Sequence, residues 1–120
     1  MMTPVTDGDL ELVDTHAHIT LAAFDTDREA VLARARDAGV RYVVCPAVDL
    51  ASSHRAVAVA EYHPGLGVAV GVHPSDVPAG GLSPSDLAEL EVLSNAPRVV
   101  AIGETGLDYS RGRELETQQR

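Results

Sequence analysis

The chain has 120 residues, which is room for one domain with a hydrophobic core but not for two. Its hydrophobic share of 45% is ordinary for a folded protein and argues against wholesale disorder. The formal net charge is −9, with nine Arg and no Lys, so bulk electrostatics do not attract this chain to a phosphate polymer. A nucleic-acid substrate would therefore require local positive charge from a bound metal.

Residues 1–9 are acidic and are predicted to be a flexible leader. They lack the basic segment and the apolar segment of a signal peptide. Apolar stretches elsewhere fall far short of the roughly 20 residues that span a bilayer. We therefore expect a cytoplasmic protein. The single cysteine, Cys45, lies in an apolar run and is expected to be a small buried hydrophobic residue and not a reactive thiol.

The first predicted unit is a strand over residues 10–19, which opens apolar and ends polar. A helix is expected over residues 25–38, with Asp25 or Thr26 as its cap and Gly39 at the position that follows its end. A second strand is predicted over residues 42–48. This strand is apolar nearly throughout, as in a parallel sheet that is covered on both faces.

The pattern then repeats. A second helix is expected from Ser52 or Ser53 to Tyr62, and a strand over residues 67–72, whose glycines suggest close backbone approach. Ser83 followed by Pro84 is typical of a helix start. That helix is followed by a fourth strand over residues 99–103 and by the beginning of another helix near residue 110.

Four strand–helix units at intervals of roughly 30 residues predict an α/β fold, namely half of an eightfold (β/α) TIM barrel with a parallel sheet. This domain would extend over residues 10–120. An open doubly wound sheet is the alternative, but no glycine-rich phosphate turn follows the first strand.

Metal-binding residue types lie at the end of two of these strands. His16 and His18 flank Ala17, and alternate residues of a strand share one face with their Cα atoms about 6.6 Å apart. Glu104 directly follows the fourth strand, where a carboxylate needs a partner or a metal. Because parallel strands of a barrel end at one rim, the three side chains are expected to bind one cation. Asp14 either orients a histidine or bonds to the loop backbone.

Other polar residues reach the same rim. His73 follows the third strand and is a candidate for catalysis or substrate binding. Asp108 either binds metal, orients water or bonds to the backbone of a rim loop. Arg111, like Arg113, belongs to a solvated helix start or contacts a substrate phosphate. Histidines outside the rim, His54 and His63, are expected to be solvated or to lie at helix ends.

The strings LVDTHAHI, GVHP and IGETGLDY, in this order, resemble the N-terminal half of TatD-type metal-dependent deoxyribonucleases, which belong to the amidohydrolase-like barrel group. The resemblance implies a TIM barrel with one or two divalent ions (Mg, Mn or Zn) that hydrolyses DNA phosphodiester bonds, often from the 3′ end. It implies that His16 and His18 are metal ligands, that Glu104 is the carboxylate ligand, and that His73 faces substrate phosphate. Gln118 fits the helix that follows the third motif.

Three positions depart from the family pattern: Thr20, Ser75, which replaces a frequent second histidine, and Thr105. Family members are about twice as long, and their later half supplies two further histidine ligands and an aspartate that activates water. The chain is therefore expected to self-associate or to require a missing C-terminal half, with DNA as the substrate. Two alternatives are an enzyme acting on amides or lactones and a metal-binding half barrel without catalytic activity.

Overall fold

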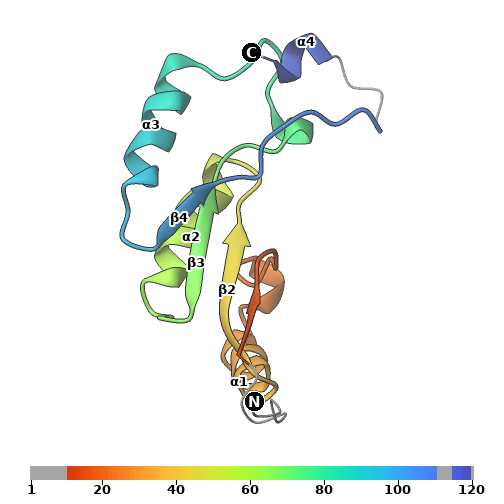
Figure 1. Ribbon diagram of the computed structural model, residues 1–120. Helices are drawn as coiled ribbons and strands as arrows, with labels where there is room; N and C mark the ends of the chain where they lie inside the picture. The colour runs from red at the N-terminus through yellow and green to blue at the C-terminus, as the bar shows by residue number, and fades with distance from the viewer. Residues whose placement is uncertain (1–10, 111–114, 120) are drawn as a thin grey trace, which may run out of the picture.

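The computed structural model describes residues 11–110 and 115–119, and in this part of the chain four strands alternate with helices (Figure 1). All four strands are parallel, and their order in the sheet is their order in the sequence. The arrangement confirms the predicted α/β class. The strands are β1 (Leu12–Asp14), β2 (Val40–Pro46), β3 (Leu66–Val70) and β4 (Val99–Ile102).

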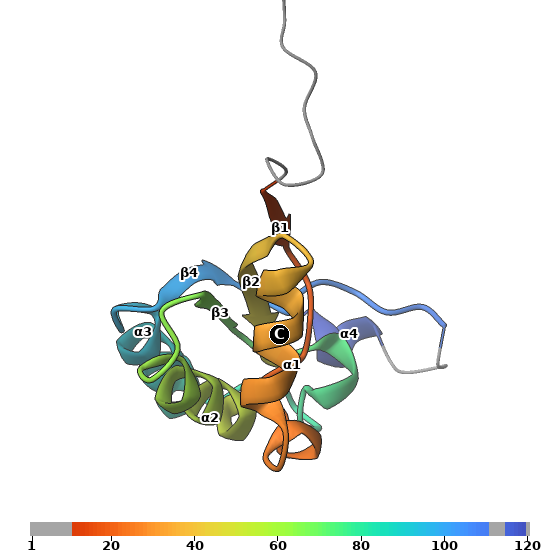
Figure 2. The same cartoon turned by 90° about the horizontal axis from the view of Figure 1, so that it is seen from below.

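Three helices lie along one side of the curved sheet (Figure 2). They are α1 (Arg28–Asp37), α2 (Leu50–Ala60) and α3 (Pro84–Ser94). Leu66, Val68 and Val70 of β3 are fully buried and form the centre of the core, with Leu32 of α1 and Leu93 of α3 packed into the same cluster. Two short 3₁₀ helices (Ala22–Phe24 and Pro74–Asp76) and α4 (Leu115–Gln118) complete the described elements.

The helix starts correct two predictions. The N-cap of α2 is Asp49, whose side chain accepts a hydrogen bond from the Ser52 backbone, so the predicted start at Ser52 or Ser53 was wrong. Ser52 instead occupies the third position of the helix. Its hydroxyl accepts a hydrogen bond from the Asp49 backbone N–H, which completes a capping box. Likewise neither Asp25 nor Thr26 caps α1: its N-cap is Asp27, which makes no side-chain cap bond, and the Asp25 carboxylate is paired with Arg28 and Arg55 instead.

Other helix signals were interpreted correctly. Ser83 caps α3 with Pro84 at its first position, and Asp86 completes a capping box. Gly39 follows α1 with a φ of 96°, a left-handed conformation that favours glycine. Cys45 is fully buried, and this burial raises the pKa of its thiol.

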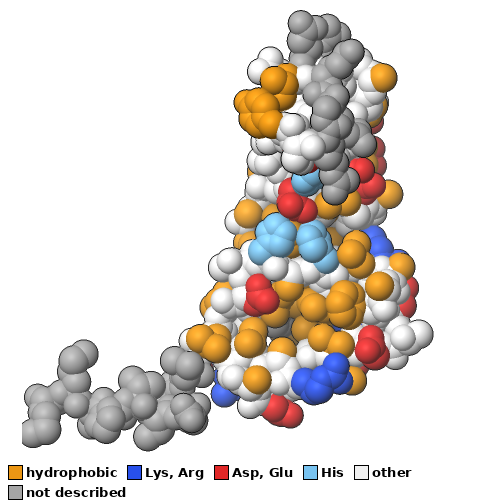
Figure 3. Space-filling view, turned by 90° about the vertical axis from the view of Figure 1, so that its right-hand side faces the viewer, with side chains coloured by type: hydrophobic (Ala, Val, Ile, Leu, Met, Phe, Trp, Pro, Cys, Tyr) orange, Lys and Arg blue, Asp and Glu red, His pale blue; other side chains and the backbone are white. Residues whose placement is uncertain are grey.

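The strands at the two ends of the sheet expose apolar side chains. Val13 of β1 is 58% exposed, and Val100 and Ile102 of β4 are 56% and 63% exposed. Within the described residues β1 pairs only with β2, and β4 only with β3. Figure 3 shows hydrophobic side chains around a group of histidine and acidic side chains on one face.

Two further predictions concern the end of the first strand and the N-terminal leader. The first strand ends at Asp14, five residues earlier than predicted. The predicted leader lies outside the described residues. No helix in the described part of the chain has the length and apolar character needed to cross a bilayer.

Candidate metal centre

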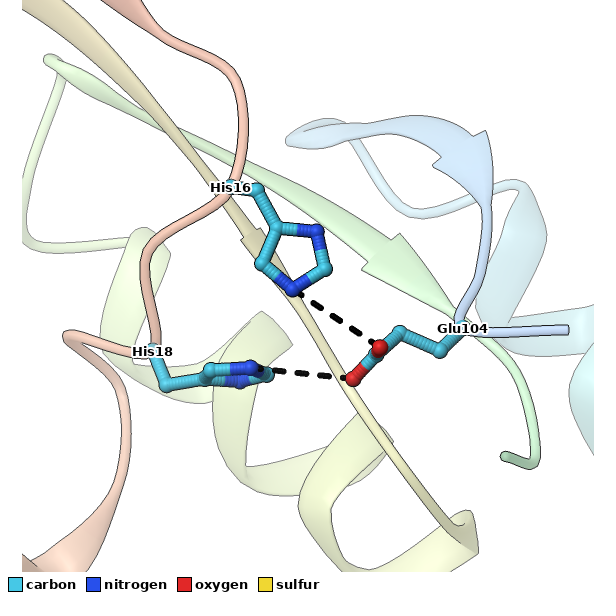
Figure 4. Close-up of side chains that lie close together, drawn as sticks. All are labelled: His16, His18 and Glu104. Carbon is cyan, nitrogen blue, oxygen red and sulfur yellow. Dashed lines mark ion pairs between the residues drawn. The ribbon is translucent and has the colours of Figure 1, made fainter. Parts of the chain in front are cut away.

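His16, His18 and Glu104 converge at the carboxyl ends of the strands (Figure 4). The Nε2 atom of His16 lies 3.7 Å from Oε1 of Glu104, and Nε2 of His18 lies 3.6 Å from Oε2 of the same carboxylate. The two imidazole rings meet edge to face, with their centroids 5.1 Å apart. Sequence spacing thus correctly predicted that these three side chains come together.

The histidines lie just beyond β1 and not within it. The extended course of β1 nevertheless continues past its end, because the Ala17 N–H donates to the Val44 carbonyl of β2 at 3.1 Å. Asp14 accepts a hydrogen bond from the His16 backbone N–H at 3.0 Å. This bond is the second of the two functions proposed for Asp14, since the carboxylate fixes the backbone of the loop.

Two consecutive carbonyl groups at the end of β2 hold the site together. The Pro46 carbonyl lies 3.1 Å from Nδ1 of His18, and the Ala47 carbonyl accepts the Glu104 backbone N–H at 2.7 Å. A carbonyl oxygen only accepts hydrogen bonds, so Nδ1 of His18 carries the hydrogen. In the neutral ring the lone pair then lies on Nε2, the atom that faces Glu104. Sequence reasoning missed these partners, because backbone carbonyls leave no signal in residue identity.

The close approach of the chain at Glu104 depends on Gly71. A Cβ atom at Gly71 would lie 2.7 Å from the Gly103 carbonyl oxygen and 2.9 Å from that of Glu104. Both distances are too short for a side chain without movement of the backbone. The glycine after β3 therefore allows the end of β4 to lie where Glu104 reaches the histidines, as the predicted close approach implied.

The three side chains fit a divalent cation. Bonds of about 2.05 Å to a tetrahedral zinc ion place its ligand atoms about 3.3 Å apart, close to the separations of 3.6 and 3.7 Å. The candidate ligand atoms all lie within 4.8 Å of one another. Two imidazoles and a carboxylate also form a donor set that zinc and similar ions accept. Side-chain exposures of 55% for His16, 33% for His18 and 24% for Glu104 leave access from solvent.

His73 and Asp108 belong to a neighbouring network and not to the three-ligand group. The Ser75 backbone N–H donates to Nδ1 of His73 at 3.0 Å, so Nε2 of the neutral ring carries the hydrogen. The Ser75 hydroxyl lies 3.3 Å from Oδ2 of Asp108, whose other oxygen accepts from the backbone and side chain of Ser110. This network links the segments that follow β3 and β4.

Gln118 of α4 holds the Asp108 backbone from both sides. Asp108 N–H donates to the Gln118 side-chain oxygen at 2.8 Å, and the Gln118 amide donates back to the Asp108 carbonyl at 3.0 Å. The helical glutamine thus anchors the loop after β4. Arg111 and Arg113, proposed as phosphate contacts, lie outside the described residues.

The remaining two histidines tie helices together. His54 of α2 pairs with Glu89 of α3, and Nδ1 of His63 lies 3.5 Å from Glu29 of α1. Neither residue lies in the metal-ligand group of the described chain. The 51% exposed side chain of His54 and the place of His63 just after the end of α2 agree with the prediction that these histidines are solvated or lie at a helix end.

A parallel βα sheet with two histidines and a carboxylate that could hold a metal at the carboxyl ends of its strands is typical of metal-dependent hydrolases. Comparison with known families and structures identifies the family within this class. The model of the family described as TatD related DNase matches residues 13–120. The chain therefore belongs to this family, as the three sequence motifs indicated.

Individual relatives show the same similarity. The chain is 39% identical to a 3′-5′ ssDNA/RNA exonuclease TatD from Cronobacter turicensis over 90% of its own length and 40% of the relative's length. It is 41% identical to the uncharacterized metal-dependent hydrolase YabD of Bacillus subtilis, covering 82% of the chain and 38% of that protein.

A solved structure agrees in fold. The crystal structure of YjjV, a TatD homologue from Escherichia coli K12, superposes with a TM-score of 0.75 at 34% sequence identity, over 89% of the chain and 42% of YjjV. The chain thus spans about 40% of the length of the curated relatives and of the barrel it matches.

Proposed function

We propose that this chain provides the first metal-binding strands of a divalent-cation-dependent hydrolase that cleaves phosphodiester bonds in single-stranded DNA from the 3′ end. The observation that carries the proposal is the convergence of His16, His18 and Glu104 on one point at the strand ends. The relative named as a 3′-5′ ssDNA/RNA exonuclease supports the choice of substrate.

The proposed ligand set suits such chemistry. When bound, a divalent cation supplies a Lewis acid for a phosphoryl oxygen and positive charge that this acidic chain lacks. Two imidazoles and one carboxylate leave coordination positions open for water and substrate. The hydrogen bond between His18 and the Pro46 carbonyl fixes the imidazole ring with Nε2 toward Glu104 and the proposed cation. The ring therefore needs less reorganisation when the cation binds.

Residues outside the ligand set have separate proposed functions. His73 carries its hydrogen on Nε2, so it can donate to a phosphate oxygen. Asp108 bonds to Ser75 and Ser110, which supports positioning of the loop that follows β4. Arg111 is proposed as a further phosphate contact on the basis of the sequence alone.

A 5′-labelled single-stranded oligonucleotide tests the proposal. The chain is incubated with Mn²⁺ or Mg²⁺, alone and with a separately expressed C-terminal portion of a full-length relative. We expect stepwise shortening from the 3′ end in at least one arm, abolished by Glu104→Gln but not by His54→Ala. If neither arm shortens the oligonucleotide, or if Glu104→Gln shortens it equally well, the proposed function is wrong.

A further inference from the structure

Two arginines bond to the loop that follows His18. Nε of Arg28 donates to the Ile19 carbonyl at 2.8 Å, and Nη2 of the same side chain donates to the Leu21 carbonyl at 3.0 Å. Nε of Arg55 donates to the Thr20 carbonyl at 2.9 Å. Three consecutive carbonyl groups are thus held by side chains that come from two different helices.

Asp25 links these two arginines. Its Oδ1 atom accepts from Nη2 of Arg28 at 2.7 Å and also pairs with Arg55. Hydrogen bonds from the two guanidinium groups lower the pKa of Asp25, so its charge is retained to low pH. We call Arg28, Arg55 and Asp25 the guanidinium clamp. Arg28 begins α1, and Arg55 lies in α2, so the clamp ties the loop to both helices.

The same loop is held from its other side. Nδ1 of His18 bonds to the Pro46 carbonyl at the end of β2 at 3.1 Å, and Thr20 is only 4% exposed. The His18 carbonyl accepts the Leu21 N–H at 3.2 Å, which closes a tight turn directly after the ligand. The segment of residues 18–21 is therefore bonded on the sheet side and on the helix side.

We propose that the guanidinium clamp is a positioning element that sets the orientation of the His18 imidazole for the cation. The proposal rests on the metal site described above. Movement of the Ile19 and Thr20 carbonyls would shift the adjacent His18 and break the 3.1 Å contact of Nδ1 with Pro46 that directs Nε2 to Glu104. A guanidinium fork suits this function, because it bonds a carbonyl and a carboxylate at once in fixed geometry.

The test compares Arg55→Ala with Arg98→Ala. Arg98 also donates to a backbone carbonyl, that of Pro64 at 3.3 Å. Pro64 lies in the connection between α2 and β3, so this bond does not involve the loop after His18. Co²⁺ is titrated into each protein and followed by its visible spectrum, and urea unfolding records stability. We expect Arg55→Ala to weaken Co²⁺ binding roughly tenfold, the loss typical of outer partners of metal ligands, and Arg98→Ala to leave it unchanged.

A second measurement needs no metal. Long-range ¹H–¹⁵N spectra of the metal-free protein report which ring nitrogen of His18 carries the hydrogen. We expect the Nδ1–H form in the wild type and in Arg98→Ala, and a mixture of both forms in Arg55→Ala. Should Arg55→Ala fail to fold, Asp25→Asn is used in its place, because it removes the linking charge and keeps both arginines.

The outcomes separate the two proposals. If the wild type does not bind Co²⁺, the metal site is wrong, and the His18 tautomer alone decides about the clamp. If the wild type binds Co²⁺ and the clamp variants match it in affinity and in tautomer, the clamp serves only to pack the helices and the inference is overturned.

Discussion

Gly71 shows how a residue without a side chain positions a ligand. Its Cα lies so close to the Gly103 and Glu104 carbonyl groups that even a methyl group would collide with backbone. Backbone atoms cannot rotate away as the end of a side chain can. Two features therefore determine the position of Glu104: residue 71 has no side chain, and the Glu104 N–H donates to the Ala47 carbonyl.

Gly71→Ala is expected to destabilise the fold by about 1–3 kcal/mol, the usual cost of overpacking, and to weaken divalent-metal binding because Glu104 is displaced. Gly65→Ala is the matched control, because its Cβ would meet the Arg41 carbonyl at the more tolerable distance of 3.4 Å. Gly65 also lies far from the metal ligands in the sequence. Urea unfolding and metal titration measure the two effects. Equal metal affinity in both variants would contradict this account of Gly71.

At the scale of elements, the sequence predicted the alternation of strands and helices and the joint position of His16, His18 and Glu104. Apolar strands and polar strand ends are local signals, so they could be recognised without a structure. Helix starts were harder to predict, because Asp25 has the chemistry of a cap but is recruited by Arg28 and Arg55. The contacts of the Pro46 and Ala47 carbonyls depend on the fold alone.

The capping box of α3 predicts a pH dependence. Hydrogen bonds from the Ser83 backbone and side chain lower the pKa of Asp86 from 3.8. A lowered folded-state pKa means that the stabilisation is fully present above pH 3.8 and is lost as the pH falls through the folded-state pKa.

We expect the difference in unfolding free energy between wild type and Asp86→Asn to shrink as the pH falls into this range. Urea denaturation over a series of pH values measures this difference. The other carboxylates titrate in both proteins and cancel in the comparison. A difference that stays constant with pH would show that the Asp86 carboxylate does not stabilise the helix start.

At the scale of the whole molecule, the sheet leaves apolar side chains of β1 and β4 exposed, and each of these strands pairs with one neighbour in the described chain. Parallel strands with an unpaired edge are templates for association with another chain. The chain matches about 40% of the length of its relatives, so those relatives contain further structure outside the matched part.

The chain alone is therefore expected to self-associate, with a weight-average sedimentation coefficient that rises with concentration. Val13→Lys combined with Ile102→Lys should shift it toward monomer, because lysine on an edge strand opposes pairing. Val92→Lys, at a position 74% exposed on α3, is the control for added charge and should not change association. A wild-type coefficient independent of concentration would refute the expectation.

The central claim is that His16, His18 and Glu104 together hold one divalent cation. Calorimetric titration with Zn²⁺ tests it most directly, in the wild type, His16→Ala, Glu104→Ala and the control His54→Ala. We predict binding at one site or more in the wild type and His54→Ala, and a loss of affinity of roughly tenfold or more in the two ligand variants. Unchanged Zn²⁺ affinity in both His16→Ala and Glu104→Ala would contradict the claim.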